Sequence, residues 1–231
     1  MVSRFDVCED VYLIGGQEIS ALEDCCVYLL NVGELVLIDT GAGRSYPLLV
    51  RNIEEIGLNP ELISAVILTH CHIDHVGGTR SFREGYNCKV IAHGLDAATL
   101  ENGDPDLTGA SLYNINFSPV PVDIKLTQAK EILNFANQEV VCLHTPGHTP
   151  GSISIYMDRC GKRVLFGQDI HGPFLKGMGS DLEQWRDSME LLLSLDADIL
   201  CEGHFGVYSP KDGVKEYIEG YLKYYGFEGE G

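Results

Sequence analysis

The chain has 231 residues, of which 45% are hydrophobic and 22% charged, and this composition predicts one globular domain over residues 1–231 with a sizeable core. Its net charge of −18 argues against nucleic acid as a partner, because binding to phosphates needs a cationic surface. We expect no membrane partner and a cytoplasmic location, since the sequence shows neither a long uninterrupted apolar stretch nor the cationic start and apolar core of a signal peptide.

The first half of the chain alternates apolar runs with helical patterns. The apolar runs predict strands at 11–14, 26–30, 35–38, 65–69 and 89–92. We expect one helix from Pro47 to Gly57, because proline is favoured in a first turn. A second helix is expected from about Asp74 to Glu84.

The second half repeats this style after a less regular stretch at 94–135, which contains turn-forming residues. Its apolar runs predict strands at 139–144, 152–157, 163–168 and 197–201. Ser180 and Glu183 stand at capping-box spacing before a helix over 181–194, and a final helix is expected over about 211–225. Mixed strands and helices in two similar halves predict an α/β fold.

The most informative segment follows the strand at 65–69 and reads Leu-Thr-His-Cys-His-Ile-Asp-His-Val-Gly-Gly. It gathers His70, His72, Asp74 and His75. Imidazole nitrogens and carboxylate oxygens suit a divalent ion such as zinc. Histidine makes up only 8 of 231 residues, so chance is a poor explanation for this cluster. We interpret the segment as a metal site.

Three further candidate ligands share one sequence context. His148, Asp169 and His204 each follow an apolar run and lie beside glycines, which permit tight turns and close backbone approach. In α/β folds, polar groups at strand ends are where sites are normally assembled. Any one of them alone would suit an ordinary loop residue, but as a set they favour a shared site.

The ligand series resembles that of the metallo-β-lactamase-fold metallo-hydrolase superfamily. The resemblance rests on His70-x-His72-x-Asp74-His75, His148, Asp169 and His204, and on an Asp39-Thr40-Gly41 turn. It covers nearly the whole chain and implies a four-layer αβ/βα sandwich. It also implies one metal held by His70, His72 and His148. A second metal would be held by Asp74, His75 and His204, with Asp169 bridging the two ions.

Two Zn²⁺ ions sharing one water would make hydrolysis the natural reaction. Zinc lowers the pKa of bound water to about 7, which would supply a metal-bridging hydroxide. The ions would also stabilise the charge that develops on an acyl oxygen. Asp74 is the candidate catalytic residue, since it would orient the hydroxide as well as bind metal. The expected substrate is a small molecule with a polarised acyl bond of the thioester or lactone type.

Among these relatives the chain looks most like the glyoxalase II-type thioesterases. Those enzymes append a helical domain with basic residues that hold glutathione, whereas about 27 residues follow His204 here. A generic acyl or thioester hydrolase is therefore the favoured interpretation. The alternative is an oxidoreductase that resembles the persulfide dioxygenases. It would use one Fe²⁺ at the positions of His70, His148 and Asp169, and a mixed Fe/Zn site also stays open.

Other side chains are candidates for supporting roles. His171 is a candidate substrate contact or an ordinary loop histidine, and Asp39 is expected to orient a metal ligand from behind. The segment Gly172–Gly179 has the composition of a mobile lid. Possible substrate contacts in the irregular stretch are Leu112, Tyr113 and Phe117.

The remaining histidines and the cysteines favour structural roles. His93 and His144 are expected to be structural. The eight cysteines include no Cys-x-x-Cys pair, and a disulfide framework is not expected in a chain of this size. Cys25 and Cys26 are either two buried thiols, which we favour, or a redox pair. The oligomeric state stays open.

Overall fold

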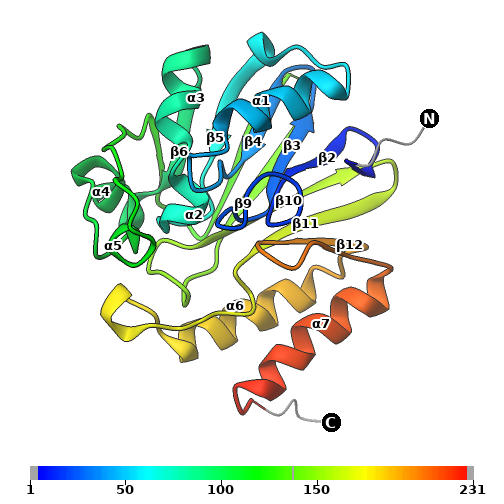
Figure 1. The fold of residues 1–231 in the computed structure, drawn as a ribbon. Coiled ribbons are helices and arrows are strands. Elements are labelled where there is room, and N and C mark those ends of the chain that lie inside the picture. The colour runs from blue at the N-terminus through cyan, green and yellow to red at the C-terminus, as the bar shows by residue number, and fades with distance from the viewer. Residues whose placement is uncertain (1–4, 137, 228–231) are drawn as a thin grey trace.

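Two β-sheets stack face to face with helices on both outer sides (Figure 1). The computed structural model describes residues 5–136 and 138–227. Across the first sheet the strands are β1 (Asp6–Cys8), β2 (Val11–Gly15), β3 (Val27–Asn31), β4 (Leu35–Ile38), β5 (Ile63–Ile67), β6 (Lys89–His93) and β7 (Ile124–Leu126). Across the second they are β13 (Val207–Tyr208), β12 (Ile199–Glu202), β11 (Lys162–Gln168), β10 (Ile153–Arg159), β9 (Gln138–His144) and β8 (Lys130–Phe135).

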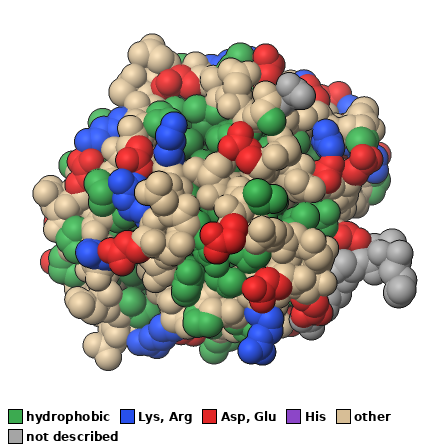
Figure 2. All heavy atoms as spheres, turned by 90° about the horizontal axis from the view of Figure 1, so that it is seen from above, with side chains coloured by type: hydrophobic (Ala, Val, Ile, Leu, Met, Phe, Trp, Pro, Cys, Tyr) green, Lys and Arg blue, Asp and Glu red, His purple; other side chains and the backbone are tan. Residues whose placement is uncertain are grey.

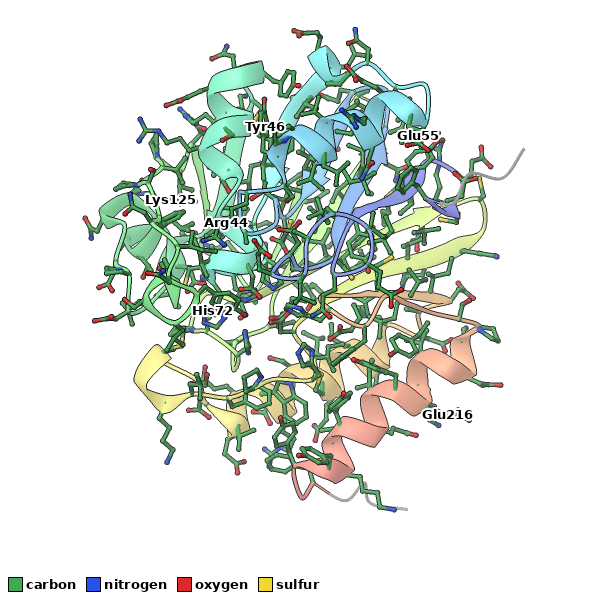
Figure 3. All side chains as sticks on the ribbon, viewed as in Figure 1. Arg44, Tyr46, Glu55, His72, Lys125 and Glu216 are labelled. Carbon is green, nitrogen blue, oxygen red and sulfur yellow. The ribbon has the colours of Figure 1, made fainter. Side chains whose placement is uncertain are left out.

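The helices divide between the two outer faces. Those from the first half of the chain are α1 (Tyr46–Glu55), α2 (Ile73–Val76), α3 (Thr79–Tyr86), α4 (Gly94–Asn102) and α5 (Ala110–Tyr113). Those from the second half are α6 (Leu182–Ser194) and α7 (Lys211–Tyr224), and they lie together below the second sheet in Figure 1. Charged side chains such as Glu55 and Glu216 project outward from α1 and α7 (Figure 3).

Parallel pairing brings the ends of several strands to one edge. Strands β4, β5, β6 and β7 run parallel, and so do β11 and β12. Parallel neighbours need a crossover connection, and helices α1, α3, α4 and α6 lie in these connections. The loops that leave the carboxyl ends of the strands therefore meet, which is where α/β folds build sites.

Three apolar clusters fill the spaces between the layers. Adjacent strand residues point to opposite faces, so Val66 of β5 packs toward the outer helices while Ile67 packs between the sheets. In β11, Leu165 packs toward α6 and α7 while Phe166 packs between the sheets. Both sheets are thus covered on both faces, and the layers run helix, sheet, sheet, helix. The predicted four-layer α/β fold is confirmed.

The predicted strands lie within two residues of the observed ones, but the helix expected from Asp74 to Glu84 is wrong. The chain forms α2 and then α3, with a break at Gly77-Gly78. A Cβ atom on Gly77 would lie 2.2 Å from the backbone oxygen of Ala42. The glycines therefore let the loop after β4 pass against the backbone between the two helices, and this close approach breaks the helix.

The cap of α6 also differs from the prediction. Asp181, not Ser180, is the N-cap residue, and its Oδ1 accepts hydrogen bonds from the backbone of Glu183 and Gln184. Ser180 instead donates to the backbone oxygen of His148 at 2.7 Å. Ser180 therefore supports a candidate metal-ligand loop rather than the helix.

The stretch at 94–135 is more regular than its turn-forming residues indicate. It contains α4, α5, β7 and β8. Along β8, which is the last strand of its sheet, exposed side chains alternate with half-buried ones until Phe135, which is buried. A search for apolar runs in the sequence misses such a strand.

Among the described helices, none is both long enough and apolar enough to span a membrane.

Candidate metal centre

The histidines gather inside the molecule rather than on its surface. All eight are buried or half-buried. No histidine is visible on the face shown in Figure 2, where acidic, basic and hydrophobic side chains are mixed. His72 lies between the half of the fold that carries α3 and the half that carries α6 (Figure 3). A buried cluster of imidazoles needs a structural or chemical reason, and its geometry supplies one.

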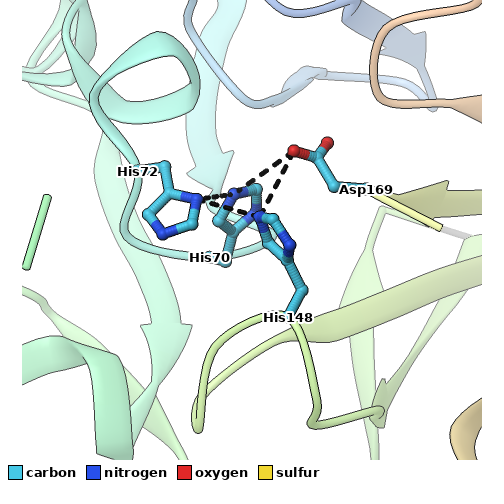
Figure 4. A group of neighbouring side chains, drawn as sticks. All are labelled: His70, His72, His148 and Asp169. Carbon is cyan, nitrogen blue, oxygen red and sulfur yellow. Dashed lines mark hydrogen bonds and ion pairs between the residues drawn. The ribbon is translucent and has the colours of Figure 1, made fainter. Parts of the chain in front are cut away.

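The first group of converging side chains comes from three loops (Figure 4). His70 and His72 come from the loop after β5, His148 from the loop after β9, and Asp169 follows β11 directly. His72 Nδ1 lies 3.1 Å from His70 Nε2 and 2.9 Å from His148 Nε2. Nitrogen ligands of a tetrahedral zinc at 2.0–2.1 Å lie about 3.3 Å apart, so this spacing fits a common ion.

The second group lies beside the first and consists of Asp74, His75 and His204. His204 Nε2 lies 3.3 Å from both His75 Nε2 and Asp74 Oδ2, and His75 Nε2 lies 3.9 Å from Asp74 Oδ2. Asp74 and His75 belong to α2, whereas His204 follows β12. One helical turn and one distant loop therefore build this group.

Asp169 faces both groups. Its Oδ2 lies 3.3 Å from His148 Nε2 and 3.4 Å from His204 Nε2, and its Oδ1 lies 3.2 Å from His75 Nε2. The close packing around Asp169 requires Gly203, where a Cβ atom would lie 2.2 Å from Asp169 Oδ1. A carboxylate in this position can bridge two ions.

Asp39 and Thr69 fix the ring orientation of two of the candidate ligands. Asp39 Oδ2 accepts from Thr69 Oγ1 at 2.7 Å and from His75 Nδ1 at 2.7 Å. Since the Thr69 hydroxyl proton goes to Asp39, His70 Nδ1 donates to Thr69 Oγ1 at 3.0 Å. Both rings then carry a proton on Nδ1, which leaves an Nε2 lone pair for a metal. Such supporting partners are typical of histidine ligands.

The electrostatics of the first group fit a metal ion. Burial lowers the pKa of His148 to about 3 and that of His72 to about 4. Both rings are therefore neutral at physiological pH, as a metal ligand must be. Asp169 Oδ1 and His148 Nδ1 are buried without a hydrogen-bond partner among the described residues, and an ion beside Asp169 would satisfy its oxygen.

The second group carries extra protons in the absence of metal. Burial disfavours a charge on His204, but the Asp169 and Asp74 carboxylates beside it outweigh burial and raise its pKa to about 10. A metal ion would replace the proton on His204 as the positive partner of the two carboxylates.

Comparison with known proteins assigns this arrangement to a family. Residues 23–204 match the sequence profile of the metallo-β-lactamase superfamily. The chain belongs to this superfamily. It is similar to a probable metallo-hydrolase of Methanocaldococcus jannaschii, at 32% identity over 187 residues that cover 77% of this chain and 85% of that protein. The predicted family is therefore confirmed, and the chain is a hydrolase of this superfamily with a metal-binding His/Asp cluster.

Two further comparisons bear on the branch and on the fold. A hydroxyacylglutathione hydrolase of Haemophilus influenzae is 31% identical over 196 residues, which cover 81% of this chain and 87% of that protein. It lends partial support to the glyoxalase II-like branch. A solved metallo-β-lactamase of Cronobacter sakazakii has a TM-score of 0.81 at 22% identity, covering 96% of this chain and 92% of its own. At this identity the likeness concerns the fold alone.

Two buried carboxylates beside the superfamily motif were missed by the sequence analysis. Asp96 of α4 accepts from Thr149 Oγ1 at 2.7 Å and from the Gly151 backbone at 2.8 Å, on both sides of Pro150 in the His148 loop. Glu202 accepts from the His204 backbone at 2.6 Å and pairs with His171 Nδ1 at 2.8 Å. The position of Glu202, directly after an apolar run and close to His204, could have indicated its role from the sequence. No sequence signal could have indicated the role of Asp96, because its partners are more than 50 residues away in the chain.

A cavity of about 280 Å³ opens onto both groups. His171 lines it, as do Tyr113 and Leu112, so these residues lie where the sequence analysis expected substrate contacts. Phe117 does not belong there, because it is buried in the cluster between the first sheet and its helices. Four residues of the predicted lid Gly172–Gly179 form part of the cavity wall; they are Gly172, Pro173, Leu175 and Met178.

The side chains expected to be structural lie outside the two groups around Asp169, although Cys25 lies with Asp39 and His75 in a further set of atoms close enough to hold an ion. His93 and His144 stack with ring centroids 3.9 Å apart, and neither belongs to a group that could hold an ion. All eight cysteines are free. Cys25 and Cys26 are buried, and burial raises the pKa of both thiols, that of Cys26 to about 11. Such thiols are poor nucleophiles, in line with the favoured prediction.

Proposed function

We propose that this chain is a binuclear zinc hydrolase that cleaves a thioester or lactone bond in a small molecule. The observation that supports it best is the position of Asp169 between two groups of converging ligand atoms. The first ion would be held by His70, His72 and His148. The second would be held by Asp74, His75 and His204, and Asp169 would bridge them.

The chain's own residues supply the orientation and the proton transfer. Two divalent ions bound here would acidify a water molecule and polarise an acyl oxygen. Asp74 lines the cavity and offers its Oδ2 as the acceptor for the proton of the attacking water. Tyr113 Oη donates to the same Oδ2 at 3.5 Å, which holds the carboxylate toward the cavity.

The second candidate is an oxygen-dependent reaction of the persulfide dioxygenase type at one iron. It draws support from the first group, since His70, His148 and Asp169 form a two-histidine, one-carboxylate set typical of non-haem iron. The complete second group beside it favours the binuclear hydrolase, because a one-iron reaction gives Asp74 and His204 no role.

The proposal is tested by hydrolysis assays on the zinc-loaded chain. We expect thioesters to be cleaved, as followed by loss of thioester absorbance, and activity to vanish on chelation. Asp74→Asn should lower kcat by about 10²–10⁴-fold, the range of general acid–base contributions. Asp158→Asn is the matched control, since Asp158 pairs with Arg163 on the surface. Full activity in Asp74→Asn would contradict the role of Asp74.

A further inference from the structure

The cavity beside the ligand groups has a wall of apolar side chains from several loops. They are Leu22, Leu112, Tyr113, Leu175, Met178 and Phe205. Several are strongly exposed to solvent, Leu22 at 79% and Leu112 at 73%. The loop before α5 approaches the segment after β11 closely, with Gly109 and Met178 lining the same cavity, and a Cβ atom added to Gly109 would lie 3.1 Å from Met178 Cε. Exposed apolar side chains gathered at one cavity are typical of a site for an apolar ligand.

Away from the ligand groups, the described wall of the same cavity offers no lysine or arginine to an anionic substrate. Among the described residues that line it, none is a lysine or an arginine. Its charged side chains, apart from the histidines, are carboxylates, namely Glu23, Asp74 and Asp169. A substrate carboxylate or sulfonate placed against this wall would lose its hydration without gaining a charged partner, which is costly.

Arg44 and Lys176, in neighbouring segments, do not supply a free cation to the cavity either. Arg44 on the loop before α1 (Figure 3) pairs with Glu23 at 3.5 Å and donates to the backbone oxygen of Asn114. Its charge is therefore already opposed by a cavity carboxylate. Lys176 follows Leu175, but its side chain is exposed and lies outside the cavity lining.

We propose that the cavity takes an uncharged substrate with an apolar acyl group, and that it selects against anionic thioesters such as those of glutathione. The identity of the cleaved bond in this inference rests on the proposed function. The selectivity of binding does not depend on it. The apolar wall would cover the acyl chain, and the absence of lysine and arginine from the described lining would disfavour an anionic leaving group.

Binding is measured with thioethers, which cannot be hydrolysed. The probes are S-octyl N-acetylcysteamine, which is uncharged, and S-octyl 2-mercaptoethanesulfonate, whose sulfonate is anionic and a weak metal ligand. Calorimetry on the zinc-loaded protein should show the uncharged probe bound at least tenfold more tightly. Shortening its alkyl chain should weaken binding by about fourfold per methylene, from about 0.8 kcal/mol each. Equal or tighter binding of the sulfonate would overturn the inference.

Variants test whether the lining causes the selectivity. Leu112→Arg should reduce the ratio of affinities between the uncharged probe and the sulfonate probe by at least tenfold, because it places a cation in the cavity wall. Leu95→Arg is the matched control, since Leu95 is also exposed but does not line the cavity, and it should leave the preference unchanged. Arg44→Ala and Lys176→Ala should not weaken sulfonate binding. A marked loss of sulfonate binding in either would contradict the inference.

The matching octanoyl thioesters separate this inference from the proposed function. If the uncharged probe binds preferentially and its thioester is cleaved, both stand. If the preference holds but no thioester or lactone is cleaved, the proposed hydrolase function fails while the binding inference is supported. If thioesters are cleaved with a preference for the anionic one, the inference is overturned and the hydrolase function stands.

Discussion

At the scale of single residues, the site depends on side chains that fix the protons of the candidate ligands. Asp39 accepts hydrogen bonds from Thr69 and His75, and Thr69 in turn accepts a hydrogen bond from His70. Asp39 itself has a φ of 61°, a left-handed conformation that is unusual outside glycine and is often kept at functional sites. Asp39 thus contacts a candidate ligand, and its role in orienting a bound metal stays a prediction.

We predict that Asp39→Asn weakens binding of the second metal by about 10–100-fold. An amide that turns its NH₂ toward His75 would favour the tautomer with the proton on Nε2, where the metal should bind. The affinity is measured by competition with a chromophoric chelator. Asp158→Asn serves as the surface control. Unchanged affinity in Asp39→Asn would show that the Asp39–His75 contact has no part in metal binding.

We also predict that metal binding to the second group releases protons. With a pKa of about 10, His204 is protonated at neutral pH and must lose that proton to bind a metal. Burial disfavours a charge on His75 as well, but Cys25 and the neighbouring carboxylates outweigh burial and raise the pKa of His75 well above its ordinary value. Because both rings must lose a proton, apparent affinity should rise by about a hundredfold per pH unit through the neutral range. The first group should release none near neutral pH, since His72 and His148 are already neutral. Calorimetry in buffers of different ionisation enthalpy counts the protons, and release of none would contradict the account.

At the scale of elements, strand ends and helix starts carry the site. The sequence predicts this well where an apolar run leads directly into a polar ligand, as at His70, Asp169 and His204. The sequence does not predict the role of a residue whose contacts come from segments far away in the chain. Asp96 lies in a stretch that reads as irregular, yet α4 places it against the His148 loop. Phe117 reads as a rim residue but is buried in the core, because packing depends on neighbours that no local pattern specifies.

Asp96→Asn is predicted to loosen the His148 loop. The substitution replaces one acceptor oxygen with an amide nitrogen, so Thr149 or Gly151 loses its partner, at a cost of about 1–3 kcal/mol in the free energy of unfolding. Binding of the first metal should weaken while the second is little changed. Denaturant unfolding together with site-resolved metal titration measures both effects. Equal loss at the two sites would contradict a local role for Asp96.

The break between α2 and α3 is predicted to depend on Gly77. Gly77→Ala places a methyl group against the Ala42 backbone and should lower the free energy of unfolding by about 2 kcal/mol or more. Gly220→Ala is the matched control, because nothing lies within 4 Å of a Cβ atom there. In the middle of α7 it should raise stability by about 0.5–1 kcal/mol. Denaturant midpoints of the two variants measure these changes. If Gly77→Ala left the free energy of unfolding unchanged, the packing argument would be contradicted.

At the scale of the whole molecule, the four layers bring both halves of the chain to one site. The first half supplies His70, His72, Asp74 and His75, and the second half supplies His148, Asp169 and His204. The motif and its spacing were enough to predict the superfamily and the layer order, because the resemblance covers nearly the whole chain. The single domain over 1–231, the cytoplasmic location and the absence of a nucleic-acid partner stay predictions. The substrate could not be predicted, since the cavity wall is assembled from loops far apart in sequence.

The central claim is that two zinc ions occupy the cluster, and elemental analysis tests it most directly. The chain is purified without added metal or chelator, and the metal content is expressed per chain. We predict close to two zinc ions per chain, falling to about one when His204 is replaced by alanine. About one iron per chain with little zinc would contradict the binuclear hydrolase and favour oxygen-dependent persulfide chemistry.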